Sequence, residues 1–351
     1  MPVMTVTGLR DVGELGIILP HEHLFIDLRN QFVEFADMGK RRISHLPVGA
    51  ETLGILRHNP YAVRDNLLLD DLETTVAEVL YFKNAGGATI VDCTVPGIKR
   101  DVRQLRELSL RTGVQVIAGC GYYTYDTHPA AMEEWSPEEI AAQMVRDLTE
   151  GIDGTGIRAG VIGEIGAGEP IHPNERKVLL AAALAFTQTG APVYVHTYPW
   201  GRTGLEITDL LLRRGVDPAR VVICHTDVEP DPDYILALLQ QGVWIEFDNF
   251  GKEFDIDPAD RAFAGGIFVT DRERIGVLQR LVTEGYAGQL LLTNDICLKQ
   301  MLHAYGGSGY DHILRNVVPM MRDEGVPTEM IDRIIRENPK RLFSSREGGF
   351  Q

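Results

Sequence analysis

The stretch Leu15-Gly16-Ile17-Ile18-Leu19-Pro20-His21-Glu22-His23 decides how the chain folds. Its aliphatic residues form one nearly continuous apolar run, which predicts a β-strand buried on both faces. The run ends abruptly in three residues with ionisable side chains. Buried strands that end in such residues are typical of an α/β barrel, because the active site of that fold lies at the carboxyl ends of its strands.

Seven further short apolar runs follow the first, and amphipathic stretches separate them. The predicted strands are Leu15–Pro20, Ala88–Thr94, Val114–Cys120, Ala159–Ile165, Pro192–His196, Arg220–His225, Val243–Asp248 and Gln289–Asp295. Among the intervening stretches, Ser136-Pro137-Glu138-Glu139 is a capping box with proline at the first helical position. The alternation of eight strands with helices predicts the α/β class and a closed (β/α)8 TIM barrel, with residues 1–351 forming a single domain.

Two segments are longer than a minimal barrel needs. Residues 27–69 form an insert after the first predicted strand, and residues 250–270 form a long loop after the seventh. Long segments of this kind in compact domains are usually functional. We therefore expect both to shape a pocket for a small-molecule substrate.

Composition excludes several other functions. The 351 residues include 34 Lys and Arg against 50 Asp and Glu, which gives a net charge of −16. Such an acidic protein repels phosphate backbones and anionic lipids, so neither nucleic acid nor membrane is expected as a partner. No apolar run reaches the roughly 20 residues of a membrane helix, and the first residues do not resemble a secretory signal. A cytoplasmic location is the expectation.

The motif His21-Glu22-His23 is the first candidate site. Residues two apart on a strand point the same way, with Cα atoms about 6–7 Å apart, so the two histidines can chelate one metal ion. Glu22 then points to the opposite face, where we expect a structural contact. For this motif alone, a hydrogen-bonded histidine pair is an equally good interpretation.

The ends of later strands add more candidate ligands. Glu164, His196, His225 and Asp295 each follow or end a predicted strand, so all should reach the same rim as His21 and His23. Burying so many ionisable groups together is costly without cations. Four imidazoles and two carboxylates suffice for two divalent ions, and this mixture favours Zn²⁺, with Mn²⁺, Fe²⁺ or Co²⁺ as substitutes. Two such ions can activate a shared water, which predicts a hydrolase.

In these motifs the chain resembles the phosphotriesterase family of the amidohydrolase superfamily. The segments that carry the resemblance are Pro20-His21-Glu22-His23-Leu24, Gly121-Tyr122-Tyr123-Thr124-Tyr125, Gly160-Val161-Ile162-Gly163-Glu164-Ile165-Gly166, Val195-His196-Thr197, Cys224-His225-Thr226-Asp227, Thr293-Asn294-Asp295 and Glu337-Asn338-Pro339-Lys340-Arg341-Leu342-Phe343. They span nearly the whole chain. Glu164 stands where most of the family has a carboxylated lysine, as in the branch typified by the bacterial phosphotriesterase homology protein.

The resemblance implies a set of ligands and roles. His21, His23 and Asp295 would hold a buried ion, His196 and His225 a more exposed one, and Glu164 would bridge the two. Asp295 would also take a proton from the shared water and pass it to the leaving group. Tyr123 would orient the substrate, and Asp227 would either hydrogen-bond behind His225 or relay protons. The family resemblance also suggests a homodimer.

The family resemblance allows several classes of substrate. Relatives hydrolyse lactones, other carboxylic esters, amides or phosphotriesters, and Asn249 replaces a histidine that phosphotriesterases carry. The leading hypothesis is hydrolysis of a lactone or carboxylic ester. The alternatives are an amidase acting on an N-acyl amine, a weak or promiscuous phosphotriesterase, and a non-catalytic barrel that binds metal or ligand. Asn249, Trp200 and Lys252 are the candidate substrate-binding residues, Lys252 for an anionic group.

Overall fold

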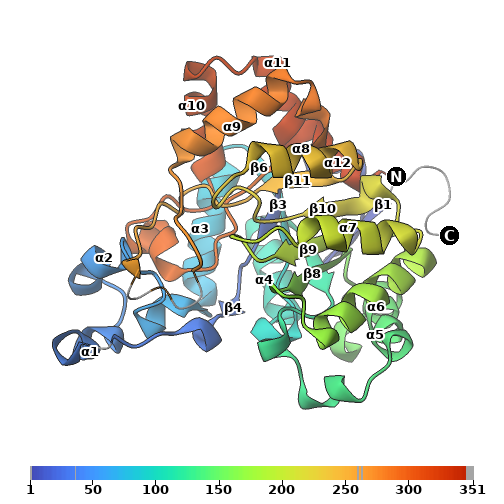
Figure 1. Ribbon diagram of the computed structural model, residues 1–351, viewed down its shortest axis with the longest axis horizontal. Coiled ribbons are helices and arrows are strands. Elements are labelled where there is room, and N and C mark those ends of the chain that lie inside the picture. The colour runs from blue at the N-terminus through green and yellow to red at the C-terminus, as the bar shows by residue number, and fades with distance from the viewer. Residues whose placement is uncertain (1, 36, 259–260, 262–263, 345–351) are drawn as a thin grey trace.

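Eight parallel strands form the centre of the molecule in the computed structural model, which describes residues 2–35, 37–258, 261 and 264–344. Along the sheet their order is β12-β11-β10-β9-β8-β7-β6-β3, and β12 lies next to β3, so the sheet forms a nearly closed barrel (Figure 1). The strands are β3 (Ile17–Glu22), β6 (Gly87–Asp92), β7 (Gln115–Cys120), β8 (Val161–Ala167), β9 (Val193–Thr197), β10 (Val221–Ile223), β11 (Trp244–Phe247) and β12 (Leu290–Leu292). The prediction of eight barrel strands is confirmed.

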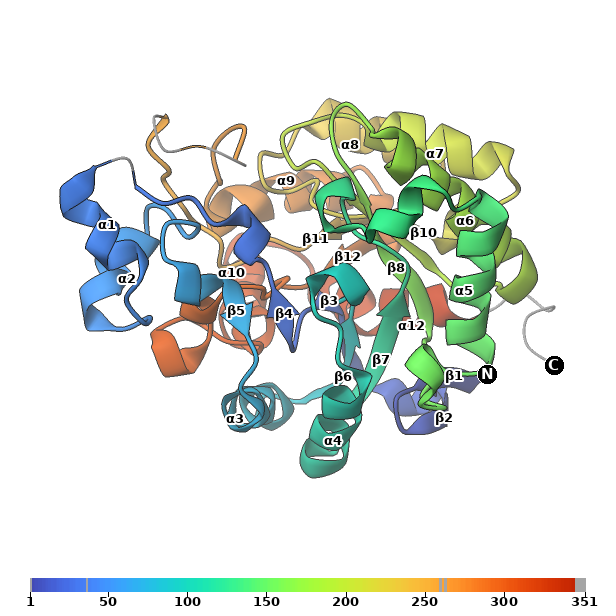
Figure 2. The same cartoon turned by 90° about the horizontal axis from the view of Figure 1, so that it is seen from below.

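Helices surround the strands (Figure 2). They are α3 (Leu72–Asn84), α4 (Val102–Thr112), α5 (Pro137–Thr149), α6 (Pro173–Thr189), α7 (Gly204–Arg213), α8 (Pro232–Gln240), α9 (Asp271–Thr283), α10 (Val318–Asp323), α11 (Thr328–Asp332) and α12 (Asn338–Phe343). The predicted capping box begins α5, where Oγ of Ser136 accepts a hydrogen bond from the backbone N–H of Glu139. No described helix is both long enough and apolar enough to cross a membrane.

A short hairpin, β1 (Pro2–Thr5) and β2 (Gly8–Asp11), precedes the barrel and was not predicted. The backbone N–H of Val6 donates a hydrogen bond of 2.8 Å to the carbonyl of Val116 near the start of β7. Val3 packs with Leu15 in a hydrophobic cluster that also contains inward-facing residues of the barrel. The hairpin therefore lies at the amino-terminal end of the strands, opposite the rim where a barrel carries its active site.

A pair of short strands joins the two ends of the insert between the first and second barrel strands. Strand β4 (Ile26–Asp27) pairs antiparallel with β5 (Leu68–Leu69), so the two ends of the insert meet beside the barrel. Between them, α1 (Met38–Ser44) and α2 (Ala50–Leu56) project to one side, at the left of Figure 1. The predicted long loop after β11 leads into α9, and residues 259–260 and 262–263 within it lie outside the described residues.

Candidate metal centre

Six ionisable side chains meet at the carboxyl ends of the barrel strands. They are those of His21, His23, Glu164, His196, His225 and Asp295, and each residue is at most 5 % exposed. They come from the end of β3 and the residue after it, from the middle of β8, from the end of β9 and from the segments just after β10 and β12. The structure thus brings together the six predicted ligands, although they are as far apart as residues 21 and 295 in the sequence.

The carboxylate of Glu164 lies at the middle of this group. Its Oε2 is 3.1 Å from Nδ1 of His196, 3.0 Å from Nε2 of His225 and 3.5 Å from Nε2 of His21. Its Oε1 is 3.6 Å from Nε2 of His23. Two groups of potential metal ligands result, one with His21 and His23 and one with His196 and His225, and both include Glu164. A carboxylate shared in this way can bridge two cations.

One buried atom shows that these residues fit a metal ion. Nε2 of His21 has no hydrogen-bond partner among the described residues, although oxygens of Glu164 and Asp295 lie 3.5 and 3.7 Å away. A buried polar atom without a partner is costly and uncommon in a folded protein. Imidazole nitrogens and carboxylate oxygens are the donors that zinc and the other divalent transition metals prefer. The cluster is therefore able to bind metal.

The pKa values show how strongly the carboxylates and imidazoles interact. Burial by itself would lower the pKa of His21, but the negative charges of Glu164 and Glu246 outweigh burial and raise it to about 10. Burial would raise the pKa of Glu164, yet the surrounding imidazoles, led by His21, hold it well below its usual range. Protons thus occupy the cluster when no cation does, and a metal ion would displace them.

Two of the six residues have a strained backbone. The φ angles are 63° at His225 and 48° at Asp295, in the left-handed region that residues other than glycine seldom adopt. Such a conformation costs about 1–3 kcal/mol and persists only where the surroundings enforce it. At His225 the backbone N–H donates to the carboxylate of Asp248 at 3.0 Å. Strain at both positions is consistent with a functional requirement for the direction of these side chains.

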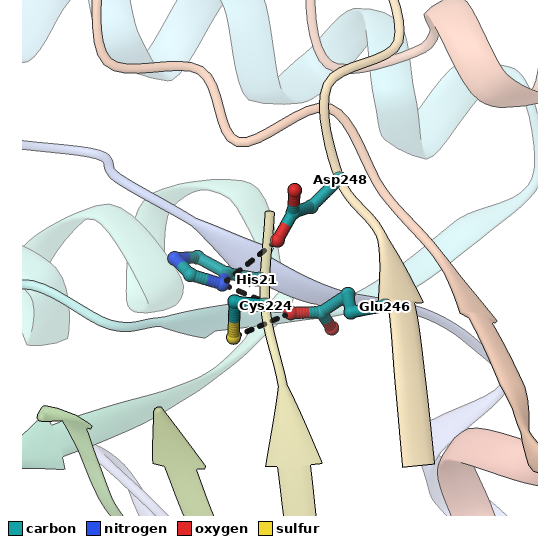
Figure 3. A group of neighbouring side chains, drawn as sticks. All are labelled: His21, Cys224, Glu246 and Asp248. Carbon is teal, nitrogen blue, oxygen red and sulfur yellow. Dashed lines mark hydrogen bonds and ion pairs between the residues drawn. The ribbon is translucent and has the colours of Figure 1, made fainter. Parts of the chain in front are cut away.

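Two carboxylates that the sequence analysis did not identify, those of Glu246 and Asp248, contact the histidines, and Figure 3 shows both beside His21. Oε2 of Glu246 on β11 lies 3.0 Å from Nδ1 of His21 and 3.2 Å from Sγ of Cys224. Oδ1 of Asp248 lies 3.1 Å from Nδ1 of His225. Histidines that bind metal usually donate their other N–H to a carboxylate in this manner. The sequence did carry a signal, because these two acidic residues are two apart in an otherwise apolar strand.

The prediction that Asp227 hydrogen-bonds behind His225 was wrong, because Asp248 occupies that position. Asp227 instead accepts hydrogen bonds from the backbone N–H of Asn249 at 3.0 Å and from its Nδ2 at 2.9 Å. It also pairs with the buried guanidinium of Arg274 at 3.4 Å. The chain changes direction at the left-handed His225, so Asp227 reaches the loop after β11 rather than the histidine ring.

A small cavity of about 50 Å³ opens onto the centre. The predicted residues Tyr123, Trp200, Asn249 and Lys252 all line it, whereas Asp227 does not. Oη of Tyr123 is 3.2 Å from Nδ1 of His196, and the ammonium of Lys252 donates to Oδ2 of Asp295. The indole N–H of Trp200 donates to the carbonyl of Ile267.

The insert contributes to the same cavity. Leu28, Gln31 and Tyr61 lie within the insert, and all three line the cavity. The long loop after β11 adds Phe254 and Phe268. Both segments that the sequence analysis singled out therefore form walls of this pocket, while the metal-binding residues come from the barrel itself.

Comparison with known proteins agrees with this geometry. The model of the phosphotriesterase family matches residues 1–343. The N-acetyltaurine hydrolase of Danio rerio is 38 % identical over 345 residues, which cover 97 % of each chain. A resiniferatoxin-binding protein from Rhodobacter sphaeroides superposes with a TM-score of 0.94 at 35 % identity, covering 99 % of this chain and 96 % of the other. The phosphotriesterase homology protein of Escherichia coli, solved with phosphate in its active site, gives a TM-score of 0.78 at 31 % identity, with 94 % and 99 % covered. The chain therefore belongs to the phosphotriesterase family, a family of hydrolases.

Proposed function

We propose that this protein uses two divalent metal ions to hydrolyse the amide bond of a small N-acyl amine. The observation that carries the proposal is the position of Glu164, which lines the cavity and is shared by two groups of potential ligands. The choice of an amide over an ester is supported by relatives named N-acetyltaurine hydrolase, which match almost the full length of the chain. The lactone or ester hypothesis becomes the second candidate.

The residues would divide between the two ions as the family resemblance implies. His21, His23 and Asp295 would hold one ion, His196 and His225 the other, and Glu164 would contact both. When bound, the ions would supply Lewis acidity and lower the pKa of a water molecule that attacks the carbonyl carbon. The proposal for the metal is Zn²⁺, because the ligands are imidazoles and carboxylates.

Asp295 is the proposed proton carrier of the reaction. Amide cleavage requires a proton on the departing nitrogen, so a group must take the proton from water and deliver it there. Burial opposes the ionisation of Asp295, but the ammonium of Lys252 together with His23 and His21 holds its pKa well below the usual value. The carboxyl group of Asp295 is thus ionised before the reaction begins.

Two further residues are proposed to position the substrate. Burial raises the pKa of Tyr123 well above its usual value, so its hydroxyl stays protonated and can donate a hydrogen bond to a substrate in the cavity. Lys252 carries the only ammonium or guanidinium group among the described residues that line the cavity. It would favour a substrate with an anionic substituent, such as the sulfonate of N-acetyltaurine. Asn249 and Trp200 would complete the wall.

Steady-state kinetics on matched substrates test this proposal. Protein loaded with zinc would be assayed against N-acetyltaurine, N-acetyl amino acids, a δ-lactone, an aryl ester and a phosphotriester. We expect kcat/KM for the best N-acyl amine to exceed that for the lactone by about tenfold or more, a difference of about 1.4 kcal/mol in transition-state binding. Faster turnover of the lactone, ester or phosphotriester would overturn the choice of substrate.

The metal is tested separately. Purified protein would be dialysed against zinc and its metal content measured by mass spectrometry. We expect two ions per chain. A chain that retains no divalent ion would overturn the proposed chemistry, whatever the substrate assays give.

A further inference from the structure

The barrel has a seam between its first and last strands. Strands β3 and β12 are the two ends of the hydrogen-bonded sheet, and no backbone hydrogen bond joins them in the part of the chain that the structure describes. Yet ligands of the proposed metal centre lie on both sides of this seam. His21 and His23 are on the β3 side, and Asp295 follows β12. Something other than the sheet must set the distance between them.

The side chain of Glu22 spans the seam. Its Oε1 accepts hydrogen bonds from Oγ1 of Thr293 at 2.6 Å and from the backbone N–H and Nδ2 of Asn294, both at 2.9 Å. Its Oε2 accepts from the backbone N–H of Ile296 at 2.7 Å. Glu22 is fully buried and does not line the cavity. The glutamate between the two histidines therefore binds the segment after β12 at four donors.

Two of these hydrogen bonds flank Asp295 in the sequence. The two backbone amides that Glu22 accepts, those of Asn294 and Ile296, belong to the residues on either side of Asp295. Asp295 itself has a φ of 48°, a conformation that needs support from its surroundings. A carboxylate only accepts hydrogen bonds, so both flanking N–H groups must point toward Glu22. This arrangement directs the Asp295 side chain the other way, toward Nε2 of His23 at 3.2 Å.

Other contacts across the seam reinforce the same geometry. Oγ1 of Thr293 also lies 2.7 Å from the carbonyl oxygen of His21, and the hydroxyl of Tyr310 donates to the carbonyl of His23 at 2.8 Å. We infer that Glu22 is a positioning residue that holds Asp295 at the correct distance from His21 and His23 for both sides of the seam to bind one ion. This inference rests on the proposed metal centre.

The substitution Glu22→Gln tests it. Glutamine is nearly the same size, but its amide N–H₂ would face the backbone N–H of Ile296. The hydrogen bond that Glu22 accepts from Ile296, on one side of Asp295, is therefore lost. We expect zinc affinity, measured by competition with a chromophoric chelator, to fall about tenfold or more for one of the two ions. We expect kcat to fall with little change in KM, and the visible absorption bands of the Co²⁺-loaded protein to shift, because the ligand geometry changes.

A matched control is available in Glu78→Gln. Glu78 on α3 is also buried; it accepts the backbone N–H groups of His303 and Ala304 at 2.9 Å and makes no hydrogen bond to any of the six candidate ligands. We expect this variant to lose thermal stability while zinc affinity, the Co²⁺ spectrum and kcat stay at wild-type values. If Glu22→Gln behaves in the same way as this control, Glu22 is only a structural residue and the inference is overturned.

If Glu22→Gln does not fold, Asn294→Ala decides, since it removes the Nδ2 donor to Glu22 and leaves in place both the backbone donors and the contact of Thr293 with His21. A few-fold weaker zinc affinity in that variant supports the inference, and an unchanged affinity overturns it. If wild-type protein binds two zinc ions but hydrolyses no amide, the proposed substrate is wrong while the zinc and cobalt measurements still test Glu22.

Discussion

All four histidines at the centre use Nδ1 for a contact within the protein, and for His196 the partners are Glu164 and Tyr123. Nδ1 lies near Glu246 for His21, near Thr94 for His23 and near Asp248 for His225. A carboxylate can only accept, so Nδ1 of His21 and of His225 carries a hydrogen, and an incoming cation would displace the proton on Nε2 rather than the one on Nδ1. The supporting side chains thus select the tautomer in which Nε2 can bind a cation.

At this residue scale, Asp248→Asn should weaken metal binding by about 10–100-fold, the usual effect of losing a carboxylate behind a metal-bound histidine. Asp227→Asn serves as the comparison, because Asp227 contacts Asn249 and Arg274 and not His225. Zinc affinities of the two folded variants, measured by chelator competition, check the prediction. Equal losses in both would mean that Asp248 has no special part in holding His225.

Glu164→Ala tests the shared ligand directly. Because Glu164 belongs both to the group with His21 and His23 and to the group with His196 and His225, its removal should reduce the metal content from two ions to one or none. Turnover should fall by about 10³-fold or more if two ions are required for the reaction. Metal analysis after gel filtration gives the answer, with circular dichroism to confirm folding. Retention of two ions would rule out a bridging role.

Asp295→Asn separates metal binding from proton transfer. The amide oxygen can still approach His23, but the side chain can no longer accept a proton. We expect turnover to fall by about 10²–10⁴-fold, the range for loss of a general acid or base, while at least one zinc ion is retained. Wild-type rates in a variant with full metal content would contradict the proposed role of Asp295.

At the scale of whole elements, the insert and the barrel contribute different parts of the site. The barrel strands and the segments just after them carry all six candidate ligands, whereas the insert, closed at its base by the pairing of β4 with β5, supplies Leu28, Gln31 and Tyr61 to the pocket wall. The cavity between them holds only about 50 Å³. Pocket size is therefore a property of the insert and the loop after β11, and changes there should alter substrate preference without removing the metals.

Leu28→Ala is the prediction that follows for the insert. Leu28 is buried and lines the cavity, so its truncation should enlarge the pocket. We expect the ratio of kcat/KM for a butyryl amide to that for the acetyl amide to rise several-fold, since one or two methylene groups in an apolar pocket are worth about 1–3 kcal/mol. Assays of the acyl series check it. Leu184→Ala on the exposed face of α6 is the control, and an unchanged ratio in Leu28→Ala would contradict the assignment.

For the molecule as a whole, the metal centre should contribute to stability. The candidate ligands come from both ends of the barrel sheet, so ions bound there would connect β3 to the segment after β12 as well as to β8, β9 and β10. An ion that binds the folded chain and not the unfolded chain stabilises it by about 2.7 kcal/mol at a free concentration of 100 Kd.

Removal of metal with a chelator should therefore lower Tm by about 5 °C, and added zinc should restore it. Thermal melts followed by circular dichroism measure the shift. Mg²⁺ at the same concentration is the control, because a hard cation prefers oxygen ligands and should restore Tm less well than Zn²⁺. A Tm that neither chelator nor zinc changes would argue against a bound ion.

Local sequence patterns were sufficient to predict the barrel strands and the six ionisable side chains that meet at its rim. The apolar runs mark the strands because a strand covered by helices on one side and the barrel interior on the other buries both faces. Each candidate ligand stands within three residues of the end of a strand or within the strand itself. Since parallel strands end at the same rim, position along the strand already implies convergence in space.

The partners of those ligands depended on the tertiary structure. The order of the strands and the left-handed turns at His225 and Asp295 determine these partners. They place Glu246 beside His21 and Asp248, rather than Asp227, beside His225. They also let Glu22 accept hydrogen bonds from the backbone on either side of Asp295. The size of the cavity likewise depends on how the insert folds against the barrel. Local apolar patterning determines strands and rim positions, whereas contacts between distant side chains exist only after the barrel closes, because no local sequence preference specifies them.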